Sequence, residues 1–126
     1  MKKLILILIF SILVQAAQLH YEHNFKEALI KAQQQNKKVM MIYSAVWCPE
    51  CNYMKDVVFK DKKVKSYLQK NFIILSLDIQ KDKLPTGYKY IGIPTFFFLR
   101  DDATLIKTIE GGSKADKFLT KLKAVK

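Results

Sequence analysis

The feature that most constrains this chain is a pair of cysteines, Cys48 and Cys51, placed where a strand-like segment gives way to a helix. The run from Val39 to Ser44 is short and mostly apolar, which is typical of a buried strand. Pro49 suits the first turn of a helix, because its absent N–H would have no partner there. The sequence therefore predicts Cys48 at the start of a helix, with Cys51 one turn further along.

Cysteines at this spacing can exchange thiol and disulfide states. Two sulfurs one turn apart on a helix can join and separate without large backbone movement. The free N–H groups and the helix dipole stabilise a thiolate at Cys48, which makes it the attacking group. Cys51 would then resolve the mixed disulfide, so the Cys48–Cys51 disulfide itself is the redox group and no further cofactor is expected.

Other uses of the pair stay open. A structural disulfide at this spacing closes too small a loop to remove much chain entropy. A metal site, for copper for example, needs about four ligands, and the other soft donors, His20 and His23, are distant in sequence. Covalent haem attachment would need a histidine in place of Asn52. The alternative to exchange is thus a copper or haem-delivery binding module, and we assign no metal site.

The rest of the chain alternates between helical and strand-like segments. Asn24 can cap a helix that fades near Asn36, Asp61 can cap another, and Ser113 a last one. The predicted strands are Val39 to Ser44, Phe72 to Asp78, Phe96 to Leu99 and Thr104 to Ile109, the last two forming an antiparallel hairpin. Residues 80–90 are polar and are predicted as a loop. This order indicates a three-layer α/β domain, a mixed central sheet with helices on both faces.

The N-terminus has the layout of a secretory signal. Two lysines precede an apolar stretch from Leu4 to Val14, and the small residues Ala16 and Ala17 follow. The stretch is shorter than the roughly 20 residues that a spanning helix needs. We therefore expect residues 1–16 to be a cleaved signal peptide and residues 17–126 to be a single exported, periplasmic domain.

The charge balance is strongly basic, with a formal net charge of +11 over 126 residues. Such a charge could favour acidic partners or anionic lipid. The lysines, however, alternate with apolar residues, as on the solvated faces of helices. No nucleic-acid-binding motif accompanies them, so we expect no nucleic-acid partner. We also expect the protein to be a monomer.

Further residues extend the constellation around the cysteines. Trp47 stands directly before the pair, and Ile93-Pro94-Thr95 precedes the predicted hairpin. With these residues the sequence resembles the thioredoxin-fold family, and more narrowly its exported bacterial thiol:disulfide oxidoreductases, over roughly residues 24–123. The resemblance implies a cis bond before Pro94, which lies against the cysteines. The residues implied to dock the substrate are Trp47, Pro49, Glu50, Ile93, Pro94 and Thr95. Trp47 could alternatively be a core aromatic.

The sequence departs from thioredoxins at two positions. Ile42 stands where thioredoxins have a buried aspartate that takes the proton of the resolving cysteine, and Ile74 replaces a lysine. Glu50, Asp56 or water could accept the proton from Cys51 instead.

The resemblance also implies a task for the protein. It would reduce disulfides in exported proteins, with electrons supplied by a membrane thiol relay. The carboxylate of Glu50 opposes thiolate formation at Cys48, which favours a reductant. A disulfide oxidase or isomerase is the alternative direction.

Overall fold

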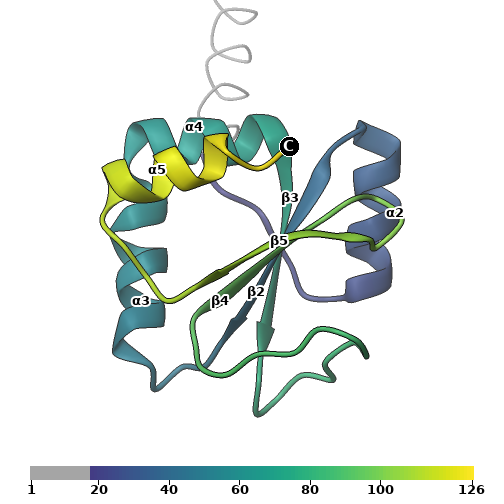
Figure 1. Ribbon diagram of the computed structural model, residues 1–126, viewed down its shortest axis with the longest axis horizontal. Coiled ribbons are helices and arrows are strands. Elements are labelled where there is room, and N and C mark those ends of the chain that lie inside the picture. The colour runs from purple at the N-terminus through teal and green to yellow at the C-terminus, as the bar shows by residue number, and fades with distance from the viewer. Residues whose placement is uncertain (1–17) are drawn as a thin grey trace, which may run out of the picture.

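In the computed structural model, the described residues 18–126 form a mixed sheet between two helical layers (Figure 1). The strands are β1 (Tyr21–Glu22), β2 (Lys38–Ser44), β3 (Phe72–Asp78), β4 (Thr95–Leu99) and β5 (Leu105–Glu110). The helices are α2 (Phe25–Gln35), α3 (Pro49–Asp56), the 3-10 turn η1 (Val58–Lys60), α4 (Lys62–Asn71) and α5 (Ala115–Lys123). The predicted signal peptide and its cleavage near Ala16 lie outside these residues. Within residues 18–126 no helix is long and apolar enough to cross a membrane.

The sheet has the order β1-β3-β2-β4-β5, which puts β2 at its centre. β3 runs parallel to β1 and β2, whereas β4 pairs antiparallel with β2 and with β5. The predicted hairpin of β4 and β5 is confirmed, with each strand boundary within one residue of the prediction. β1 was not predicted, because two residues are too few to show an alternating pattern.

Both faces of β2 are buried, which explains its nearly continuous apolar sequence. Met40 and Ile42 point into a core with α3, α4 and α5, while Met41 and Tyr43 point into a second core with α2. Figure 1 shows α2 on one side of the sheet and the other helices on the opposite side. The predicted three-layer α/β architecture is confirmed.

Side-chain caps begin two of the helices, as predicted. Asn24 accepts a hydrogen bond from the N–H of Glu27, and Asp61 accepts from the backbone of α4. The cap predicted at Ser113 is wrong. The N-cap of α5 is Lys114, which makes no side-chain cap hydrogen bond. Ser113 is instead drawn toward the core, where its N–H lies 3.4 Å from Sδ of Met54.

The long connection between β3 and β4 contains no helix, as predicted. Aromatic contacts fix it against the sheet instead. The ring of Tyr88 packs on Phe25 and Phe97, and its hydroxyl donates to the carbonyl of Ala103 at 2.6 Å. Tyr90 packs edge-on against Tyr43. This connection therefore leads to residues 91–94 along a defined path.

Candidate active site

Cys48 is the N-cap of α3, and this position follows from the local sequence. The apolar strand β2 ends at Ser44, and Pro49 fixes the first helical residue. The backbone of Cys48 is extended, and its Sγ accepts a hydrogen bond from the N–H of Cys51 at 3.2 Å. A sulfur at this position receives the positive end of the helix dipole, which lowers the pKa of a free thiol there.

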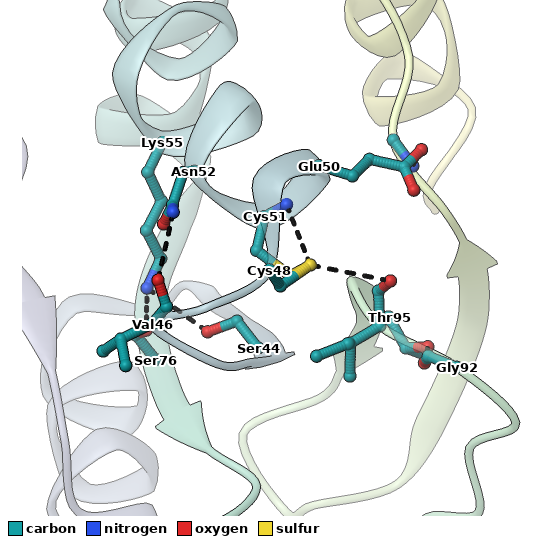
Figure 2. Close-up of a disulfide and its surroundings, with 12 residues drawn as sticks. Ser44, Val46, Cys48, Glu50, Cys51, Asn52, Lys55, Ser76, Gly92 and Thr95 are labelled. Atoms are coloured by element: carbon teal, nitrogen blue, oxygen red, sulfur yellow. Dashed lines mark hydrogen bonds between the residues drawn. A yellow bond between two sulfur atoms is a disulfide. The ribbon is translucent and has the colours of Figure 1, made fainter.

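The two cysteines are joined as a disulfide, with their Cα atoms 5.3 Å apart (Figure 2). Both side chains are covered in this oxidised form, Cys48 being 5% exposed and Cys51 2% exposed. Ala45, Ile79 and Ile93 pack around them. The pair is thus packed against apolar side chains and does not lie on a loop in open solvent.

The segment before β4 passes alongside the disulfide. The Ile93–Pro94 peptide bond is cis, and the carbonyl oxygen of Ile93 lies 3.9 Å from Sγ of Cys48. Thr95 is only 1% exposed, and its hydroxyl donates to the carbonyl of Gly92 at 2.6 Å. The side chain of Thr95 therefore supports the bend and does not lie on the docking surface, which corrects its predicted role.

Several apolar side chains are exposed on the segments that lead to Cys48 and to Ile93. Trp47 is 58% exposed, which rules out the alternative of a core aromatic. Its indole N–H donates to Oε1 of Gln80 at 3.0 Å, so the ring is held in place from the β3–β4 connection. Val46 and Ile91 are also exposed, the latter at 91%. Sequence reasoning did not single out these two, because one exposed apolar residue in a loop has no periodic signal.

Glu50 points away from the disulfide, toward the turn after β5 (Figure 2). Its Oε1 accepts a hydrogen bond from the N–H of Gly112 at 2.9 Å. The neighbouring N–H, of Gly111, donates to the carbonyl of Pro94 at 2.8 Å. The turn that contains both glycines is therefore bonded to α3 and to the segment before β4.

A polar cavity of about 250 Å³ lies behind Cys51. Lys55, one turn after Cys51 on α3, extends into it and donates to the hydroxyls of Ser44 and Ser76, at 3.4 Å and 2.7 Å (Figure 2). Burial lowers the pKa of Lys55, against the opposing effect of Asp78 and Asp56. Sequence reasoning missed Lys55, although its spacing of four from Cys51 places both on one side of a helix.

The two positions that depart from thioredoxins are apolar and buried. Ile42 is 1% exposed and Ile74 is 3% exposed, both within the core on the α3 side. Of the proton acceptors considered for Cys51, Glu50 is bonded to Gly112, and Asp56 lines a different cavity.

The two histidines are engaged by neighbours. His20 hydrogen-bonds to Glu22 at 2.9 Å, while Nδ1 of His23 lies 3.1 Å from the carbonyl oxygen of Ser76. Across residues 18–126 no group of three or more His, Cys, Asp or Glu side chains is arranged to hold a metal ion.

Comparison with known proteins agrees with this geometry. The sequence model of the thioredoxin-like domain matches residues 25–126, nearly all of the described chain. The chain belongs to the thioredoxin-like family. This membership confirms the resemblance inferred from Trp47, the cysteine pair and Ile93-Pro94-Thr95.

Individual relatives of this thioredoxin-like chain include thiol:disulfide interchange proteins. The protein named DsbD from Campylobacter jejuni is 24% identical over 81% of this chain, which corresponds to only 18% of that protein. A thioredoxin from Thermus thermophilus superposes with a TM-score of 0.71 and 28% identity, covering 85% of this chain and 86% of the other. The C-terminal domain of Neisseria meningitidis DsbD, in the oxidised form, superposes with a TM-score of 0.67 at 21% identity, over 85% of this chain and all of that domain. This last likeness concerns the fold.

Proposed function

We propose that this thioredoxin-like domain is an extracytoplasmic thiol:disulfide oxidoreductase that reduces disulfides of exported proteins. The observation that carries the proposal is the position of the Cys48 sulfur at the N-terminus of α3. This sulfur accepts a hydrogen bond from the N–H of Cys51 and forms a disulfide with the sulfur of Cys51. In the reduced protein the same N–H and the helix dipole favour a thiolate at Cys48. Cys48 is then the nucleophile, and Cys51 resolves the mixed disulfide.

The surroundings of the disulfide support docking of an extended target segment. The backbone of Ile93 runs beside Cys48 and can pair with a strand of the target, as in β-augmentation. Trp47, directly before Cys48 in the sequence, offers a large exposed apolar surface. Pro49 and Pro94 stand next to Cys48 and Ile93 in the sequence and, lacking N–H groups, cannot donate hydrogen bonds to the sulfurs.

The names of relatives and the N-terminal sequence support the proposed direction and setting of the reaction. Two relatives are named DsbD, a thiol:disulfide interchange protein, and residues 1–16 have the layout of a cleaved signal. We therefore place the protein in the periplasm as a monomer, supplied with electrons by a membrane thiol relay. The Cys48–Cys51 disulfide is its redox group.

Trapping of targets tests this function. Replacing Cys51 by Ser should leave mixed disulfides on Cys48, because the resolving thiol is lost. The double variant with Cys48→Ser as well is the matched control and should trap nothing. A folded C51S protein that captures no exported protein from oxidised cells would contradict the mechanism. The equilibrium of the pair with glutathione tests the direction, since a potential well above the glutathione poise would indicate an oxidase.

A further inference from the structure

The cavity behind Cys51 has no role in the proposed exchange between Cys48, Cys51 and a target. It is bounded by the end of β2, by β3 and by α3, and Cys51 forms part of its wall. Cys51 is thus almost fully covered, at 2% exposure, and lines this cavity together with polar side chains. A resolving thiol must lose its proton to attack, so the charges in this space affect its reactivity.

Lys55 places its ammonium group in this cavity. Its Nζ donates to Ser76 at 2.7 Å and lies 3.4 Å from Oγ of Ser44, which fixes the amine between β2 and β3 (Figure 2). The ring of Tyr21 lies below it, with its centroid 5.9 Å from Nζ. These three contacts, with side chains of β2, β3 and β1, hold the ammonium group of Lys55 on the side of α3 that carries Cys51.

Several charged groups surround Lys55. The titratable side chains that line the cavity with it are His23, Asp78, Lys81 and Asp82, and Asp56 is its neighbour on α3. Asp78 and Asp56 raise the pKa of Lys55 and so oppose the effect of burial. The two carboxylates thus favour the charged form of the lysine, whereas burial disfavours it.

We propose that Lys55 is a positioning residue for the resolving step, in which its ammonium group stabilises the thiolate of Cys51. The inference rests on the proposed exchange function. In this inference, a cation on α3 that lines the same cavity as Cys51 favours the reactive thiolate of that cysteine. A positive charge close to a thiol favours the thiolate by direct attraction, more strongly where water is partly excluded.

The step balances without a further reactant. Cys51 releases its proton to solvent, and the thiolate attacks Sγ of Cys48 in the mixed disulfide. The bond between Cys48 and Cys51 forms as the bond from Cys48 to the target sulfur breaks. The target leaves as a thiolate and takes up a proton, so the target is reduced and the cysteine pair is oxidised.

Two-step reaction with DTNB separates the two cysteines in the full-length chain. The first equivalent of coloured thiolate reports attack by Cys48, and the second reports resolution by Cys51. Stopped-flow traces would be recorded from pH 5 to pH 9 for the wild type, Lys55→Met and Lys55→Arg. We expect Lys55→Met to slow the second phase about tenfold at neutral pH, which corresponds to a rise of about one in the pKa of Cys51, and to leave the first phase unchanged. Lys55→Arg retains the charge and should restore most of the rate.

A direct titration provides an independent measurement. In the Cys48→Ser background, thiolate absorbance at 240 nm reports the pKa of Cys51 without any exchange reaction. Lys55→Met should raise this pKa, whereas Lys62→Met, at an exposed position on α4, is the matched control and should not. If Lys55→Met fails to fold, as judged by circular dichroism, Lys55→Gln replaces it, because the amide can still bond to the serines.

The outcomes distinguish this inference from the proposed function. An unchanged second phase and an unchanged pKa of Cys51 in Lys55→Met would overturn the role of Lys55. So would equal slowing in Lys55→Met and Lys55→Arg, because the charge would then not be the cause. A first phase no faster than that of free cysteine would instead contradict the proposed function, while the 240 nm titration would still test Lys55.

Discussion

The carboxylate of Glu50, in the middle of the cysteine motif, is bonded to the backbone N–H of Gly112, 62 residues further along the chain. This contact connects the first turn of α3 to the turn between β5 and α5. It also directs the negative charge of Glu50 away from the disulfide (Figure 2). The side chain between the two cysteines therefore has a structural partner, in addition to any effect on the thiolate.

Removing this carboxylate should destabilise the fold modestly. Glu50→Ala loses the hydrogen bond to Gly112 and a favourable charge at the N-terminus of α3, together about 1 kcal/mol in the free energy of unfolding. Urea denaturation of the oxidised protein measures the change. Glu110→Ala, which removes an exposed carboxylate from β5, is the control and should have a smaller effect. Equal losses in both variants would show that the contact does not contribute.

The close approach of Gly112 to α3 makes this glycine sensitive to substitution. A Cβ atom at this position would lie 3.0 Å from Cγ of Glu50 and 3.1 Å from Sδ of Met54. Gly112→Ala should therefore cost about 1 to 2 kcal/mol by overpacking, measured by urea denaturation. Gly92→Ala is the matched control, because a Cβ there meets nothing within 4 Å. A Gly112→Ala protein as stable as the Gly92→Ala protein would contradict the prediction.

Trp47 should contribute to the rate at which protein disulfides are reduced, but not to the rate with small disulfides. Trp47→Ala removes an exposed aromatic surface beside the disulfide, and we expect about a tenfold loss in kcat/KM for insulin reduction. The rate of the first DTNB phase should stay the same, because the environment of the Cys48 sulfur is retained. Tyr53→Ala removes another exposed aromatic from α3 and serves as the control. If the DTNB rate fell by the same factor, Trp47 would act on the thiol and not on docking.

The hydroxyl of Tyr43 has no hydrogen-bond partner among residues 18–126, although it is buried. Tyr43→Phe should therefore leave stability unchanged or raise it by up to about 1 kcal/mol. Burial, with the nearby Tyr88 and Tyr90, raises the pKa of Tyr43 to about 12. The ordinary pKa of a tyrosine is about 10, so the contribution of this group to stability should be fully present below about pH 10 and should be lost as the pH rises from about 10 toward 12. Tyr43→Phe should remove this part of the loss of stability at alkaline pH. A marked destabilisation of Tyr43→Phe at pH 7 would show that the hydroxyl has a hydrogen-bond partner after all.

Glu22 should contribute to stability at neutral pH and lose this contribution in acid. Burial alone would raise the pKa of this carboxyl, but its bonds to Lys31 and His20 outweigh burial and lower it. An acid whose pKa is lowered by folding stabilises the protein above its unfolded pKa of about 4.3, and the effect disappears as the pH falls through the folded value. Thermal unfolding midpoints from pH 7 to pH 3 should fall less steeply for Glu22→Gln than for the wild type. Glu27→Gln, at an exposed acid on α2, should keep the wild-type slope.

Local signals in the sequence were sufficient to predict most of the fold. The caps at Asn24 and Asp61, the apolar run of β2 and the placement of Cys48 at a helix start each depend on neighbours within one helical turn. The cap at Ser113 failed for a different reason, because long-range packing near Met54 determines how the chain enters α5.

What the sequence did not reveal is the contacts that some side chains make with distant parts of the chain. Glu50 finds its partner on another element, and Lys55 reaches its serines across the end of β2 and β3. Thr95 was assigned to the docking surface from the motif alone, whereas its side chain lies inside the bend. No pattern in the amino-acid sequence encodes these directions, since they depend on the register between strands.

The turn after β5 has one further consequence. The N–H group of Gly111 binds the carbonyl of Pro94 and that of Gly112 binds the carboxylate of Glu50, so consecutive peptide units connect the segment before β4 to the first turn of α3. We therefore expect the spacing between α3 and the segment before β4 to stay the same when a target docks. Recognition of targets would then depend on exposed side chains such as the indole of Trp47, and not on widening of the space beside the disulfide.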